Sequence, residues 1–158
     1  MPLSNRDRDA LTAVLGRAPR AECEVVVRNA SGAPAVLRNA PFMDDGTPMP
    51  TRFWLVEPEL LRLVSALEAA GGVRAAELAI DPDRIAEAHA RHAAARNAEV
   101  PEGYTGPRPF GGVGGTRIGV KCLHAHYAAF LAGDDDPVGA WVADRLVASG
   151  ADDDRVHP

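Results

Sequence analysis

The chain has 158 residues, of which 46% are hydrophobic and 25% are charged, and it contains only 2 Trp, 2 Tyr and 4 Phe. This length fits one globular domain and excludes two full ones, and the core must come mainly from Leu, Val and Ala. With 17 basic and 22 acidic residues the net charge is −5. This acidic balance argues against a phosphate-neutralising surface over the whole domain, and therefore against nonspecific nucleic-acid binding.

The N-terminal segment predicts a short helix. Ser4 and Asp7 have the spacing of a capping box, apolar residues follow at helical intervals, and Gly16 is a typical stop. We therefore expect a helix over residues 5–15.

The next segment predicts a small antiparallel sheet. Two β-rich runs, 24–28 and 35–38, are separated by a turn that contains Gly32, which is typical of a hairpin. A second turn, over residues 44–46, precedes a third candidate strand at 51–56.

Helical patterns dominate the remainder, with proline and glycine at their boundaries. Helices are predicted over 58–70, from 81 to the proline-rich loop of 101–109, over 120–132, and after Asp136 and Pro137. The predicted fold is a single α+β domain over residues 1–150, in which about three antiparallel strands are packed by four to five helices. A flexible acidic tail is expected over residues 151–158.

The densest group of reactive side chains is Cys122, His124 and His126. Thiolate sulfur and imidazole nitrogen are ligands that a divalent metal ion such as zinc prefers. On a helix Cys122 and His126 share a face, and His124 joins them only if the helix begins late. A further ligand would have to come from Cys23, His89, His92, Asp134 or Asp136.

Two other interpretations of this group stay open. The cysteine and histidines can simply pack in the core. Alternatively, Cys122 is a catalytic thiolate, favoured by a helix N-terminus and by Lys121, with His126 as its base. Lys121 is the only lysine in the chain, which suggests a specific use for its compact charge.

The preceding segment predicts an anion-binding loop. Glycines allow successive backbone N–H groups to face one point, and nearby cations complete the neutralisation. The residues assigned to this loop are Gly111, Gly112, Gly114, Gly115, Thr116, Arg117 and Lys121. The alternative is a flexible loop with an incidental cation.

Weaker candidates have simpler explanations. His89 and His92 lie three residues apart on a helix that also carries Arg91 and Arg96, which favours a solvated polar face. Asp136, directly before a proline, is explained as a helix N-cap.

Three segments together resemble the bacterial domain-of-unknown-function family 501 over nearly the whole chain. They are residues 15–20, residues 45–55 with 67–73, and residues 111–126 with 136–139. Family members often carry cysteines near the position of Asn29 and just after Trp54-Leu55, and this chain lacks both. The resemblance establishes no reaction; it implies a link to cell division, because the family's genes are often found near those of a septum-formation protein.

These observations favour a site that binds an anion and a metal ion, and such a site would suit a metal-dependent hydrolase that acts on a phosphorylated small molecule. The alternatives are a non-enzymatic interaction protein linked to cell division and a thiol-dependent enzyme that uses Cys122. The expected partner is a small anionic ligand or another protein, and neither nucleic acid nor membrane is expected. No apolar run approaches the roughly 18 residues of a membrane span, and residues 1–7 lack a signal-peptide pattern, so a cytoplasmic location is expected.

Overall fold

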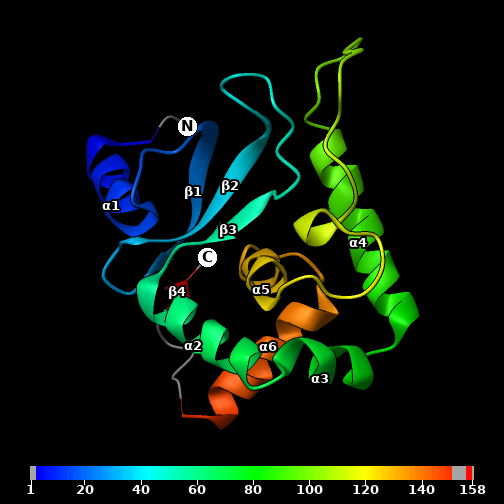
Figure 1. Cartoon of the computed structure of the whole chain (residues 1–158). Helices are drawn as coiled ribbons and strands as arrows, with labels where there is room; N and C mark the ends of the chain where they lie inside the picture. Colours follow the sequence, from blue (N-terminus) through cyan, green and yellow to red (C-terminus); the bar gives the residue numbers. More distant parts are fainter. Residues whose placement is uncertain (1–2, 151–155, 158) are drawn as a thin grey trace.

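The computed structural model describes residues 3–150, 156 and 157, and shows one small sheet with helices on both of its sides (Figure 1). The strands are β1 (Ala21–Asn29), β2 (Pro34–Met43), β3 (Phe53–Leu55) and β4 (Val156–His157). Their order is β3-β2-β1-β4, and each neighbouring pair is antiparallel. The predicted antiparallel sheet is confirmed. Its fourth strand lies within the segment predicted as a flexible tail, of which residues 151–155 and 158 are outside the described part.

Six α-helices are present in the described residues, one more than the upper number predicted. They are α1 (Asn5–Leu15), α2 (Pro58–Ala69), α3 (Gly72–Ala79), α4 (Pro82–Asn97), α5 (Leu123–Leu131) and α6 (Pro137–Ala148), with a 3₁₀ turn η1 (Val113–Gly115). The predicted α+β class is confirmed.

The unpredicted helix is α3, which begins where two glycines indicated only a stop. Gly71, at φ +87°, follows α2 and is also the N-cap of α3. Gly72 is buried, and a Cβ on it would lie 2.6 Å from the Leu67 carbonyl oxygen and 2.9 Å from Leu123 Cδ1. The second glycine therefore permits close packing between helices, a role that its place in the sequence does not reveal.

Local signals set the helix starts as predicted. The Ser4 hydroxyl oxygen accepts a hydrogen bond from the Asp7 N–H at 3.1 Å and so caps α1. Asp81 and Asp136 cap α4 and α6 through their carboxylates. Each cap satisfies N–H groups that have no partner within the helix.

The sheet separates two apolar clusters. On one face, α1 packs through Leu11 against Cys23 and Leu37. On the other face, the larger cluster includes Val36, Phe53 and residues of the remaining helices. Alternating strand residues such as Val36 and Leu37 point to opposite faces, so both sides of β2 are buried.

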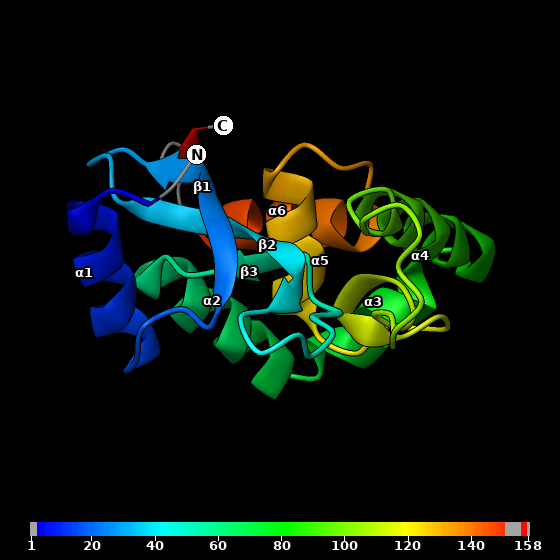
Figure 2. The same cartoon turned by 90° about the horizontal axis from the view of Figure 1, so that it is seen from above.

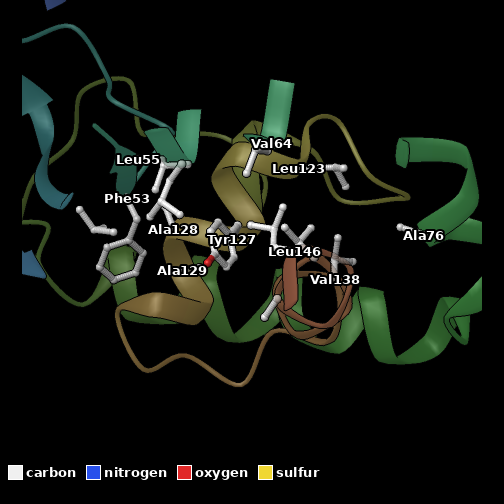
Figure 3. Packing of buried hydrophobic residues seen from close by; sticks show 14 of the residues in the cluster. Phe53, Leu55, Val64, Ala76, Leu123, Tyr127, Ala128, Ala129, Val138 and Leu146 are labelled. Carbon is white, nitrogen blue, oxygen red and sulfur yellow. The ribbon is translucent and has the colours of Figure 1, made fainter. Parts of the chain in front are cut away.

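Helix α5 lies at the centre of the larger cluster (Figure 1) and contacts β3, α2 and α6. Leu123, Tyr127, Ala128 and Ala129 of this helix pack among side chains of β3, α2 and α6 (Figure 3). The segment predicted to carry the reactive side chains is therefore the most enclosed helix of the fold.

Candidate functional site

The glycine-rich segment, residues 110–119, lies against α4 (Figures 1 and 2). A Cβ on Gly112 would be 2.5 Å from Cβ and 2.6 Å from Cα of His89, so only glycine allows this approach. Gly111 has a φ of +71°, and a Cβ there would be 2.7 Å from the Gly115 carbonyl. These two glycines allow the loop to fold tightly onto the helix.

His89 holds this segment at two points. Its Nδ1 accepts a hydrogen bond from the Val113 N–H at 3.0 Å, and its Nε2 lies 2.7 Å from the Gly119 carbonyl oxygen. Because a carbonyl can only accept, Nε2 carries the proton and the ring is neutral. Burial lowers the pKa of His89, which favours the same neutral form.

Three backbone amides of the predicted anion-binding loop have hydrogen-bond partners within the protein. The Gly112 N–H donates to the Thr116 carbonyl at 2.7 Å, and the Gly115 N–H donates to the Gly112 carbonyl at 3.0 Å. The Val113 N–H is taken by His89. These three amides hold the loop in place, so they are not free to bind an anion.

A cavity of about 510 Å³ lies between α4 and the glycine-rich segment, within the range of small-molecule sites. It is lined by Ala86, His89, Ala90, Ala93, Arg96, Asn97, Arg108, Pro109, Phe110, Gly111, Gly112 and Arg117. Three of these described residues are arginines, and none is acidic. Arg108 and Arg117 are exposed, and the Arg117 guanidinium stacks over the Phe110 ring at 4.4 Å.

Of the residues predicted to bind an anion, Gly111, Gly112 and Arg117 line this cavity. The others, Gly114, Gly115, Thr116 and Lys121, do not line it. The Thr116 hydroxyl donates to the Ile118 carbonyl, and Lys121 lies against Gly114 on a different side of the loop.

Arg96 is the most unusual residue of the cavity, because its side chain is only 1% exposed. Its hydrogen bonds all go to neutral oxygens: the carbonyls of Pro50 (3.1 Å), Pro109 (3.3 Å) and Phe110 (3.5 Å), and Oδ1 of Asn97 (3.1 and 3.3 Å). Burial lowers the pKa of the guanidinium below its ordinary value, but an arginine side chain stays charged at neutral pH. Among the described residues, no carboxylate forms an ion pair with it.

Two of the three predicted metal ligands, His124 and His126, have separate partners. His124 contacts two residues of α2, with Nδ1 2.6 Å from Glu68 Oε1 and Nε2 3.2 Å from Ser65 Oγ. His126 is turned instead toward α6. Helix α5 begins at Leu123, later than the predicted start at residue 120, yet this start does not bring His124 and His126 to one metal site. No group of three metal-ligating side chains is found in the part of the chain that the structure describes.

His126 forms a buried pair with Asp136. Its Nδ1 lies 2.7 Å from Asp136 Oδ2, and the other carboxylate oxygen accepts the N–H groups of Val138 and Gly139 at 2.9 Å. The His126 ring packs edge-on against that of His89, with 5.4 Å between centroids. Its Nε2 is buried without a hydrogen-bond partner among the described residues. The pair orients the imidazole, and the predicted catalytic role of His126 stays a prediction.

Cys122 is the N-cap residue of α5, and both it and Cys23 are free thiols. Burial raises the pKa of the Cys122 thiol, and the nearby Lys121 charge opposes this only in part. Burial also raises the pKa of Cys23. The predicted activation of Cys122 as a thiolate is therefore opposed by its surroundings.

The predicted solvated face of α4 is wrong, because His89 and His92 are each only 3% exposed. His92 lines a separate, smaller cavity of about 180 Å³, together with Asp134 and Asp136. Neither of its ring nitrogens has a hydrogen-bond partner in the described structure, and Nδ1 lies 3.9 Å from Asp134 Oδ2. Burial, assisted by the charges of Arg96 and Arg52, lowers the pKa of His92 to about 4.

Sequence reasoning missed the cavity wall on α4. His89, Ala93 and Arg96 are spaced by four and three residues and so lie on one helical face. Small alanines at 86, 90 and 93 leave space beside this face. The available signal was thus an arginine and a histidine among small residues on one side of a helix, facing a glycine-rich loop.

No helix in the described residues is long and apolar enough to cross a membrane. No curated protein and no solved structure was found to match the chain. A family model described as a protein of unknown function, DUF501, matches residues 25–144, which is most of the chain and includes α4, the glycine-rich segment and α5. The chain therefore belongs to the DUF501 family.

Proposed function

We propose that this protein binds a small anionic molecule, in first place a phosphorylated one, in the cavity between α4 and the glycine-rich segment. The observation that carries the proposal is the buried guanidinium of Arg96, whose hydrogen-bond partners are all neutral. Removing a charge from water is costly, and buried charges are normally paired. An anion in the adjacent cavity would supply the missing opposite charge.

The exposed arginines support the same ligand class. Arg108 and Arg117 line the same cavity as Arg96. A planar guanidinium donates two parallel hydrogen bonds, which match a phosphate or carboxylate. No acidic side chain is present among the described lining residues, so no carboxylate in the lining neutralises the positive charge of these arginines.

Titration calorimetry with inorganic phosphate at low ionic strength tests this proposal. Arg117→Gln and Arg108→Gln should each weaken binding about threefold to tenfold, because each removes one charged hydrogen-bond donor. Arg84→Gln is the matched control, since Arg84 is exposed on α4 and lines neither this cavity nor its neighbours. Absence of binding to the wild-type protein, or equal binding by all four proteins, would overturn the proposal.

The more specific functions predicted from the sequence stay predictions. Metal-dependent hydrolysis would require a group that activates water, and the candidate ligands His124 and His126 have separate partners in the described structure. The interaction protein linked to cell division and the enzyme that uses Cys122 are likewise untested. Anion binding is the part of these hypotheses that the cavity supports.

A further inference from the structure

A second cavity of about 260 Å³ adjoins the arginine-lined one. Its lining consists of Glu77, Pro82, Ile85, Ala86, Arg117, Ile118 and Gly119. Ala86 and Arg117 line both cavities, so the two spaces meet at these side chains. Arg117 therefore lies at the boundary between the arginine-lined cavity and the second cavity, whose lining residues are different.

The second cavity is suited to an uncharged, apolar group. Pro82, Ile85 and Ile118 contribute apolar side chains to its lining, and Ile118 is 88% exposed. Among the described residues that line it, Glu77 is the only acidic one, and its Oε1 accepts the Val120 N–H at 2.8 Å. A carboxylate at this end would repel a second anionic group of a ligand.

We propose that the ligand is an amphiphilic anion with one charged end. This inference rests on the proposed anion-binding function. Its phosphate-like headgroup binds among Arg96, Arg108 and Arg117, and its uncharged apolar tail enters the second cavity beside Ile118. The tail covers apolar surface that is otherwise in contact with water, which is favourable in proportion to the area covered. Glu77 selects against ligands that carry a second phosphate on the tail.

A homologous series of alkyl phosphates tests this inference, with methyl phosphate as the headgroup probe and ethyl, propyl and butyl phosphate as tail probes. All carry the same headgroup, so differences in affinity report on the tail. A buried methylene strengthens binding by about threefold to fourfold. We expect butyl phosphate to bind at least about tenfold more tightly than methyl phosphate.

Two variants locate the tail. Ile118→Ser should reduce the gain from methyl to butyl phosphate while leaving the affinity for methyl phosphate unchanged. Leu78→Ser is the matched control, because Leu78 is also an exposed apolar residue, at 76%, but lines neither cavity. It should keep the full dependence on tail length.

The outcomes separate the two proposals. If methyl phosphate binds and butyl phosphate binds no more tightly, the amphiphilic ligand is refuted while anion binding stands. If Ile118→Ser keeps the full tail-length dependence, the tail lies elsewhere and the inference fails in the same way. If no alkyl phosphate and no inorganic phosphate binds, anion binding itself is refuted.

Discussion

Replacing His92 by leucine should remove a large part of the acid sensitivity of the fold. His92 is 3% exposed, and its pKa lies at about 4 because burial disfavours the charged ring. In the unfolded chain the pKa returns to its ordinary value of 6.5. The unfolded state therefore binds the proton more tightly, and stability falls as the pH is lowered from 6.5 toward 4.

The magnitude follows from the two pKa values. Each pH unit between them corresponds to about 1.4 kcal/mol, so the full difference is about 3 kcal/mol of unfolding free energy. Most of it, about 2 to 3 kcal/mol, is lost by pH 4.5. Above pH 6.5 the contribution is fully present, because His92 is neutral in both states. Leucine has similar volume and no proton to bind, so its variant lacks this loss.

Urea denaturation followed by tryptophan fluorescence at pH 7.5, 6.5, 5.5 and 4.5 measures this effect. The wild-type protein should lose about 2 to 3 kcal/mol more between pH 7.5 and 4.5 than His92→Leu does. His92→Phe is a second variant, because it keeps a ring edge-on to Phe53, which now lies 6.1 Å from the His92 ring centre. Equal losses in all three proteins would show that His92 is not the group that titrates.

Three further experiments test the candidate site and the packing around it. Gly112→Ala should lower the unfolding free energy by about 2 kcal/mol or more, since the new methyl group collides with the α4 backbone at His89; unchanged stability would contradict this packing. Asp136→Ala should cost about 2 to 4 kcal/mol in thermal or urea unfolding, because it removes a helix cap and the partner of a buried imidazole; a loss below about 0.5 kcal/mol would speak against the buried pair. Cys122 and Cys23 should both be alkylated by iodoacetamide more slowly at pH 7 than the same thiols in urea, because burial raises both pKa values. Fast reaction of Cys122 alone would revive the thiolate hypothesis.

Local features of the fold could be predicted because their causes lie close together in the chain. The Ser4 cap of α1 and the Asp136 cap of α6 each depend on contacts within three residues. The hairpin turn at Gly32, with φ +81°, is of the same kind. Such interactions operate before any tertiary contact forms, so residue type and spacing determine them.

The side-chain contacts of Cys122, His124 and His126 could not be predicted in this way. Helical geometry correctly placed Cys122 at the start of a helix, but the partners of His124 and His126 come from α2 and from the start of α6. Those partners decide where each ring points. Because His124 and His126 lie two residues apart within α5, helical spacing already turns them to different faces, but it could not indicate which residues would bind each ring.

The fold class, the capped starts of α1, α4 and α6, and an unusual glycine-rich segment could all be recognised in the sequence. What that segment faces depends on contacts between distant parts of the chain: His89 binds Gly119 across 30 positions, and Arg96 binds Pro50 across 46. Burial of these two α4 side chains results from contacts with distant segments, whereas their neighbours in the sequence indicate an exposed polar face. A cavity exists only where several such segments meet, so the roles of Arg96 and Arg108 in its lining could be identified only in three dimensions, whereas Arg117 was already predicted to bind an anion.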